Sequence, residues 1–160
     1  MKRSSQASQA GKVPLARLLA MAYRQLIDAL HARLVEHGYT DVRPSFGYVL
    51  LAVREKPATG VEIAALLGVT KQAASKVVEA MEAGGYVRRD AHGDDARAKS
   101  IVLTPRGRKF LVTVESIYRD LEAEWARATS KRRIEALRDD LRIVLEAAHG
   151  GTLPPVRPTG

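Results

Sequence analysis

Apolar residues recur with the period of an amphipathic helix near both ends of the chain. The first stripe predicts a long helix over residues 13–37 that ends near Gly38. Two later stripes predict long helices over residues 105–128 and 131–148. Each of these helices has one apolar face, so each must pack against another surface of the protein or of a partner.

Shorter helices are predicted between the long ones. Pro44 suits the first turn of a helix, where its missing N–H has no intrahelical acceptor, and Pro57 stops that helix. Thr59 and Glu62 have the spacing of a capping box, in which the hydroxyl and the carboxylate each bind a free backbone N–H. This box predicts a helix that runs to about Leu67.

A tight turn and a further helix follow directly. Gly68 turns the chain, Thr70 can cap the next helix, and Gly84 ends it. From Tyr86 the apolar period changes from that of a helix to two, which predicts a β-hairpin with a polar tip at residues 91–95.

A helix-turn-helix followed by a hairpin is the order of elements in a winged helix-turn-helix. We therefore predict a mostly α fold with a small β-hairpin wing (α+β). Its DNA-binding lobe would cover residues 44–104, with long dimerisation helices before and after the lobe.

The chain has 160 residues, which is the usual size of one domain. We expect a single domain over residues 13–149. The basic segment 1–12 and the segment 150–160, rich in Gly and Pro, are expected to be disordered tails.

Cysteine is absent, which excludes disulfides, thiolate metal sites and thiol-based redox sensing. The four histidines lack the spacing of a metal site, so no metal and no cofactor is expected. The sequence has neither an apolar run of the ~20 residues that span a membrane nor an apolar leader. We expect a cytoplasmic protein without a membrane partner.

Basic residues exceed acidic ones, with 26 Lys and Arg against 18 Asp and Glu and a formal charge of +8. Residues 70–109 contain nine basic and five acidic residues, a net +4, so a quarter of the chain carries half of the excess. This distribution favours a polyanionic partner such as double-stranded DNA.

The face of the second helix opposite its apolar stripe begins with polar and basic side chains. Gln72, Ser75 and Lys76 could read base edges in a major groove, while Thr70 and Lys71 would meet phosphate. An ordinary amphipathic surface helix would also carry such side chains. The predicted DNA contacts on this helix and the wing are Thr70, Lys71, Gln72, Ser75, Lys76, Arg89, Arg97 and Lys99.

The wing supplies the last three of these contacts. Arg97 near its tip could enter a narrow minor groove, where the electrostatic potential is most negative. Asp95, on the same strand face, could position the Arg97 guanidinium through a charge-assisted hydrogen bond. The alternative is a solvated hairpin with incidental charges.

The chain resembles the MarR family of bacterial transcriptional regulators. The similarity is most specific at residues 67–76, 85–89, 95–97 and 103–107, the last two being similar to the family's wing signature. It implies a homodimer in which the long helices of the two subunits intertwine and present two winged lobes to a pseudo-palindromic operator. A self-contained helical subdomain is the alternative for the long helices.

The resemblance also implies a small aromatic or phenolic acid as effector, bound where the dimerisation helices meet the winged lobe. Aromatic residues at helical spacing usually pack in a core, which is the competing interpretation. The candidate ligand-binding residues are His31, Phe46, Tyr48, Tyr118 and Trp125.

The sequence thus predicts a dimeric, sequence-specific transcriptional regulator, a repressor whose DNA affinity responds to a small molecule. No phosphate loop, catalytic residues or Gly-rich cofactor fingerprint points to an enzyme. The alternatives are an architectural winged-helix DNA binder without sequence preference and a winged-helix protein-interaction module.

Overall fold

The fold was analysed in a computed structural model, which describes residues 13–90 and 99–158. Six helices and two strands make up the described chain, which confirms the predicted mostly helical fold with a small β-hairpin. In chain order they are α2 (Leu15–Glu36), α3 (Pro44–Glu55), α4 (Gly60–Leu67), α5 (Lys71–Ala83), β1 (Val87–Asp90), β2 (Ser100–Leu103), α6 (Pro105–Ala128) and α7 (Lys131–Ala148).

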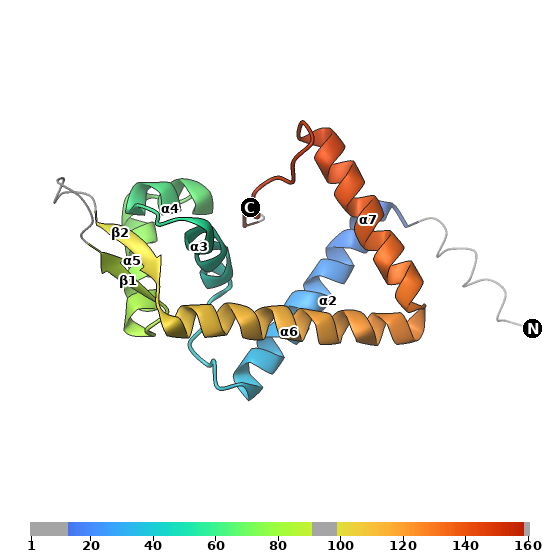
Figure 1. Ribbon diagram of the computed structural model, residues 1–160, viewed down its shortest axis with the longest axis horizontal. Coiled ribbons are helices and arrows are strands. Elements are labelled where there is room, and N and C mark those ends of the chain that lie inside the picture. The colour runs from blue at the N-terminus through green and yellow to red at the C-terminus, as the bar shows by residue number, and fades with distance from the viewer. Residues whose placement is uncertain (1–12, 91–98, 159–160) are drawn as a thin grey trace, which may run out of the picture.

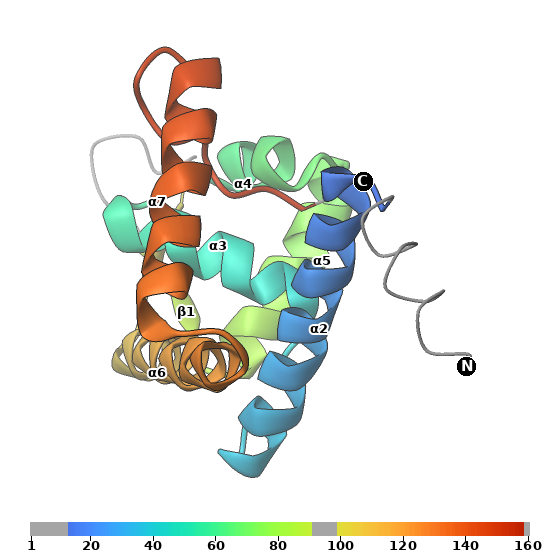
Figure 2. The ribbon, with the colours of Figure 1, turned by 90° about the vertical axis from the view of Figure 1, so that its right-hand side faces the viewer.

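The short elements form a lobe at one end of the molecule, and the long helices extend away from it. Helices α3, α4 and α5 lie together with the hairpin, and α6 runs outward from the end of β2 (Figure 1). Helix α2 packs across α6, and α7 turns back from the far end of α6 (Figure 2). The three long helices therefore form an open frame on one side of the lobe.

Local capping chemistry accounts for where the short helices begin. The Thr59 backbone N–H donates to Glu62 Oε2 over 2.7 Å, and the Glu62 N–H donates to Thr59 Oγ1 over 3.3 Å, which confirms the capping box. Pro44 occupies the first position of α3, as predicted, and α3 ends at Glu55. Each of these boundaries depends on residues within one turn of the helix end.

The hairpin has the predicted alternation of buried and exposed residues. Its antiparallel register pairs Val87 with Leu103 and Arg89 with Ile101. An isolated bridge joins Ala58 to Ile101, with the Ile101 N–H donating to the Ala58 carbonyl over 2.7 Å. This bridge, which sequence analysis missed, ties the start of α4 to the wing.

Four aromatic rings pack where the lobe meets the long helices. The Tyr86 ring lies 5.4 Å from Phe110 and 5.9 Å from Phe46, and the Tyr39 ring lies 5.0 Å from Phe110. Tyr86 is fully buried, and its hydroxyl donates to Asp41 Oδ1 over 2.8 Å. The cluster joins the base of the wing to α2, α3 and α6 through one continuous core.

The junction between β2 and α6 explains part of the motif at residues 103–107. The Thr104 hydroxyl accepts from the Gly107 N–H over 3.0 Å and donates to the Tyr86 carbonyl over 3.0 Å. A Cβ at Gly107 would lie 2.1 Å from that carbonyl oxygen, so only glycine permits this approach. The motif therefore anchors the start of α6 to the base of the wing.

Large apolar side chains remain exposed on the long helices, most of them on α2 and α7. Leu15, Leu18 and Met21 of α2 are exposed, and none of the 18 residues of α7 is buried. After α7 the chain turns at residues 149–152, and residues 153–158 form neither helix nor strand.

Candidate nucleic-acid interface and adjoining pocket

The turn between α4 and α5 depends on one left-handed residue. Gly68 has a φ of 66°, a conformation that costs glycine little, and its N–H donates to the Ala65 carbonyl over 3.3 Å. The Val69 N–H donates to the Ala64 carbonyl over 3.1 Å. These contacts end α4 and let α5 begin three residues after Gly68.

Helix α5 has one face buried in the lobe and an opposite face that is polar and exposed. The Thr70 hydroxyl accepts from the Ala73 N–H over 3.2 Å, which confirms the predicted cap. Ala74, Val78 and Met81 are buried in the lobe. The opposite face leaves Lys71, Gln72 and Lys76 exposed in the first half of the helix, where a major groove could receive them.

The remaining predicted residue on this helix, Ser75, is engaged within the chain. Its hydroxyl donates to Glu79 Oε1 over 3.1 Å, one turn further along α5. Glu79 is exposed, and a carboxylate is repelled by phosphate. Ser75 can therefore donate to a base only if it releases Glu79, although its oxygen can still accept a hydrogen bond, and the basic first half of α5 is the better DNA-binding part of the helix.

Glu82 at the end of α5 holds the first strand of the wing. Its Oε1 accepts from the Arg89 backbone N–H over 3.1 Å, and its Oε2 lies 3.0 Å from Arg89 Nη1. The predicted contact residue Arg89 is thus partly neutralised, since both side chains are only about one-third exposed or less. Sequence analysis missed Glu82, although it stands only seven residues before Arg89.

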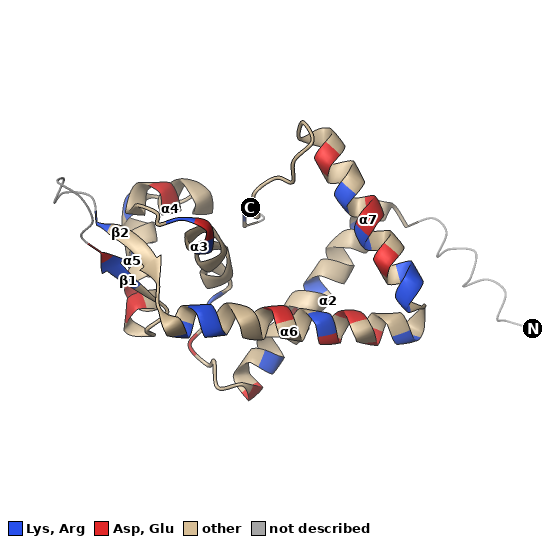
Figure 3. Ribbon diagram, viewed as in Figure 1, with Lys and Arg blue, Asp and Glu red and all other residues tan. Residues whose placement is uncertain are grey.

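The other basic residues of the hairpin differ in their surroundings. Arg88 lies 2.8 Å from Asp90 through its Nη1, whereas Lys99, next to β2, is exposed. Figure 3 shows basic positions on β1 and just before the start of β2, while basic and acidic positions are mixed along α6 and α7. The predicted wing residues Asp95 and Arg97 lie outside the described residues.

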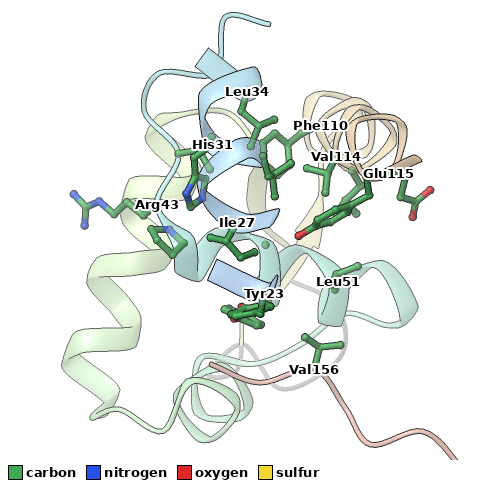
Figure 4. Close-up of a pocket in the computed structure, with 17 residues that line it drawn as sticks. Tyr23, Ile27, His31, Leu34, Arg43, Leu51, Phe110, Val114, Glu115 and Val156 are labelled. Atoms are coloured by element: carbon green, nitrogen blue, oxygen red, sulfur yellow. The ribbon is translucent and has the colours of Figure 1, made fainter. Parts of the chain in front are cut away.

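A pocket lies between the lobe and the long helices, bounded by α2, α3 and α6. Its volume is about 280 Å³. Most of its lining is aliphatic or aromatic, and the Tyr23 and Tyr48 hydroxyls meet at its edge with 2.8 Å between the two oxygens. The pocket therefore lies at the boundary between α3 of the winged lobe and the long helices α2 and α6 (Figure 4).

The structure brings some of the five predicted ligand-binding residues together and separates the others. His31, Tyr48 and Tyr118 line the pocket. Phe46 instead belongs to the aromatic core beside Tyr86, and Trp125 lies further along α6 and does not line the pocket.

Sequence analysis missed Tyr23 and Arg43 among the lining residues. Tyr23 stands four and eleven residues before Ile27 and Leu34, which also line the pocket. That helical spacing was the available signal, since such residues share one face of a helix. Arg43 lies just before α3 and has no comparable pattern.

Burial raises the pKa of two tyrosines that line the pocket. Desolvation, then the hydrogen bond with Tyr23, raises the pKa of Tyr48 to about 12. Desolvation, with a smaller contribution from the charge of Tyr23, also raises the pKa of Tyr118. Both side chains therefore keep the O–H donor at neutral pH.

The ion pair of Glu115 connects the same two parts of the molecule. Glu115 on α6 lines the pocket, and its Oε1 accepts from Arg54 Nη1 on α3 over 2.7 Å. Both side chains are about half exposed, so the pair adds little stability. The pair links α3 to α6 at the edge of the pocket.

Of the helices in the described part of the chain, none is both long enough and apolar enough to cross a membrane.

Comparisons with known proteins agree with this architecture. The family model described as "MarR family" matches residues 40–98, which hold α3, α4, α5 and β1. No curated protein sequence matches the chain. The fold is similar to those of many solved structures.

Transcriptional regulator Tm0710 of Thermotoga maritima has a TM-score of 0.70 at 23% identity, over 87% of this chain and 99% of that one. Transcriptional regulator BldR of Sulfolobus solfataricus has a TM-score of 0.59 at 26% identity, over 92% and 99%. A point mutant of MepR from S. aureus, solved with a bound oligodeoxyribonucleotide, has a TM-score of 0.62 at 21% identity, over 85% and 99%.

Proposed function

The winged segment of this chain belongs to the MarR family, and we propose that the protein is a DNA-binding transcriptional regulator that recognises a specific operator as a homodimer. The observation that carries this proposal is the exposed first half of α5. Lys71, Gln72 and Lys76 project there from a helix whose opposite face is buried. The similar fold of MepR, which was solved bound to an oligodeoxyribonucleotide, supports the same use of the fold here.

The side chains of α5 fall into two sets, those that can reach base edges and those that can reach phosphate. Gln72 has the amide that pairs with adenine, and Lys76 has the ammonium group that pairs with guanine. Lys71 and the free N–H groups of the first turn are better placed for phosphate, together with the Thr70 end of the helix. Lys99 adds a phosphate contact from the wing, and Arg97 with Asp95 remains the proposed minor-groove contact.

The exposed apolar faces of α2 and α7 support a homodimer. Leu15 and Leu18 on α2, and Leu137, Val144 and Leu145 on α7, are each more than two-fifths exposed. A monomer that leaves so much apolar surface in water gains free energy by covering it, and a second copy is the simplest cover. Two α5 helices about one DNA turn apart, ~34 Å, would then fit an inverted repeat.

Regulation by a small molecule is the third part of the proposal. The pocket is bounded by α2 and α6 on one side and by α3 of the winged lobe on the other, so an occupant would contact both parts. An effector that binds one spacing of the two α5 helices better than another would shift DNA affinity by that difference. A repressor released by its effector in the cytoplasm is the simplest use of this coupling.

A sequence-independent, architectural DNA binder is the second candidate. The formal charge of +8 favours it, because phosphate contacts alone give affinity without base readout. The two functions differ in how much binding depends on base sequence.

Selection of bound duplexes from a random pool tests the proposal. We expect an inverted repeat with half-sites about one turn apart, bound ~10³-fold or more above a scrambled control when both are compared at two salt concentrations. A pool without enrichment, combined with a steep salt dependence of binding, would show the architectural function instead. No binding to any duplex would indicate that the winged lobe serves protein interaction instead.

A further inference from the structure

One acidic side chain lies on the face of α5 that the proposed function directs toward DNA. The exposed residues of α5 are Lys71, Gln72, Lys76, Glu79 and Ala83. Gln72, Lys76 and Glu79 follow one another at intervals of four and three residues, so they form one row along the exposed face. Glu79 is therefore in line with the two side chains proposed to read bases.

The other acidic side chains in the described part of the winged lobe are each held by a nearby group. Three of them form ion pairs, which join Glu55 to Arg54 at 3.1 Å, Glu82 to Arg89 at 3.0 Å and Asp90 to Arg88 at 2.8 Å. Glu62 accepts from the Thr59 backbone N–H in the capping box of α4. Within residues 13–90 and 99–158, by contrast, no Lys, Arg or His side chain pairs with the Glu79 carboxylate. Its negative charge is therefore not neutralised on the surface proposed to meet a polyanion.

The Glu79 carboxylate has one oxygen bound and one oxygen free. Its Oε1 accepts from the Ser75 hydroxyl over 3.1 Å. In the described part of the chain no hydrogen bond reaches its Oε2. The contact with Ser75 spans one helical turn and limits the directions that the carboxylate can take. A hydrogen-bond donor that approaches the exposed face of α5 can therefore bind Oε2 without breaking this contact.

A carboxylate distinguishes base edges because it only accepts hydrogen bonds. In the major groove cytosine presents its N4 amino group, which is a donor. Guanine presents two acceptors, thymine presents one, and adenine has the N7 acceptor next to its amino group. A carboxylate that faces an acceptor loses its hydration and gains no partner. Of the four bases, cytosine alone offers a donor without an acceptor beside it on the same base.

We propose that Glu79 reads a cytosine in each half-site of the operator and discriminates against the other bases at that position. The inference rests on the proposed function in placing α5 in the major groove. Because a helix rises 1.5 Å per residue, Glu79 lies ~10 Å beyond Gln72 along α5, or about three base-pair steps of 3.4 Å. The cytosine is therefore expected within about three base pairs of the base that Gln72 reads.

Glu79 contributes selectivity at the expense of affinity. Its carboxylate is repelled by the phosphates of every duplex, whatever the base sequence. Only a duplex with cytosine in reach returns a hydrogen bond for this repulsion. Removal of the carboxylate should therefore weaken binding to the operator and strengthen binding to unrelated duplexes, two effects of opposite sign.

Two variants of the full-length protein test this proposal by fluorescence anisotropy. The duplexes are the selected operator, a set in which each base pair of the half-site is replaced in turn, and a scrambled control. At one C·G pair the wild-type protein should prefer cytosine over the other three bases by at least about fivefold. Glu79→Ala should lose this preference and bind the scrambled duplex more tightly than the wild-type protein does. Glu79→Gln, whose amide suits adenine, should accept adenine at that position at least as well as cytosine.

Asp139→Asn on α7 is the control, because it removes one negative charge outside the winged lobe. It should change neither the base preference nor the affinity for the scrambled duplex. If Glu79→Ala raised the affinity for all duplexes by the same factor, Glu79 would lie where α5 leaves the groove, and cytosine reading would be rejected. An unchanged affinity for every duplex would reject it as well.

The same measurements separate this inference from the proposed function. A wild-type preference at other base pairs that Glu79→Ala leaves intact at every position would keep the sequence-specific regulator and reject the role of Glu79. A wild-type protein that binds all duplexes equally would reject the sequence-specific regulator, and the role of Glu79 with it.

Discussion

Gly107 sets how closely α6 approaches the base of the wing. A Cβ at this position would lie 2.1 Å from the Tyr86 carbonyl oxygen and 3.0 Å from Leu103 Cδ2. Neither the carbonyl nor the helix start can move alone, because the Thr104 hydroxyl binds both the Tyr86 carbonyl and the Gly107 N–H. The methyl group of an alanine at position 107 would therefore push the start of α6 away from the base of the wing.

We therefore expect Gly107→Ala to lower the free energy of unfolding by about 3 kcal/mol, as overpacking against backbone does. Urea denaturation at a fixed protein concentration measures this change. Gly60→Ala is the matched control, since a Cβ there meets nothing within 4 Å. Alanine at Gly60 should be neutral or stabilise by up to ~1 kcal/mol. Equal stability of the two variants would show that α6 can retreat from the wing without cost.

Among the helices, α5 determines whether binding depends on sequence. Gln72→Ala and Lys76→Ala should reduce the preference among operator variants, by ~1–3 kcal/mol for a side chain that reads a base. Lys99→Ala should weaken binding to all sequences evenly, because a phosphate contact carries no base information. Fluorescence anisotropy with the selected operator and point variants of it would measure both effects.

The control for these substitutions is Lys131→Ala on α7, which removes the same charge from a helix outside the winged lobe. It should leave operator affinity within the error of the measurement. If all three lobe variants lost equal affinity on operator and random duplexes, base readout by α5 would be rejected.

The order and bounds of the elements were predictable because their signals are local. Thr59 with Glu62, Thr70 and Pro44 each fix a helix start through contacts within four residues. The bridge between Ala58 and Ile101 was not predictable in this way, because the two residues are far apart in the sequence and one residue pair has no periodic pattern.

The candidate site was predicted less completely than the fold, because part of it depends on how separate elements meet in the folded chain. Exposure of Gln72 and Lys76 follows from the apolar stripe of α5 and was correctly predicted. The pairing of Arg89 with Glu82 depends on how the chain turns at Gly84 and Gly85, which periodicity does not give. The roles of Arg97 and Asp95 stay predictions.

The arrangement of the full chain places the pocket where the long helices meet the winged lobe. The Tyr23–Tyr48 and Arg54–Glu115 contacts cross this junction from α2 to α3 and from α3 to α6. Both involve partly exposed side chains, so the junction is held by weaker contacts than the aromatic core beside it. A molecule bound in the pocket would therefore disturb these contacts before it disturbed the aromatic core.

Dimerisation through α7 can be tested at one side chain. Val144 is 65% exposed on a helix without buried residues. In a dimer that covers this face, Val144→Arg would bury an unpaired charge, which costs several kcal/mol, while a monomer would tolerate the arginine in water. We expect the variant to sediment as a monomer and to lose at least about 100-fold in operator affinity, because two linked half-sites bind far more tightly than one.

Asp139→Asn on the polar face of α7 is the control, since it changes the charge by the same amount. It should sediment as a dimer and bind the operator normally. If Val144→Arg also remained a dimer with full affinity, the second copy would not cover α7, and the exposed face of α2 would have to supply the interface alone. The two helices contact α6 separately, so the single substitution on α7 distinguishes these arrangements without altering α5 or the pocket.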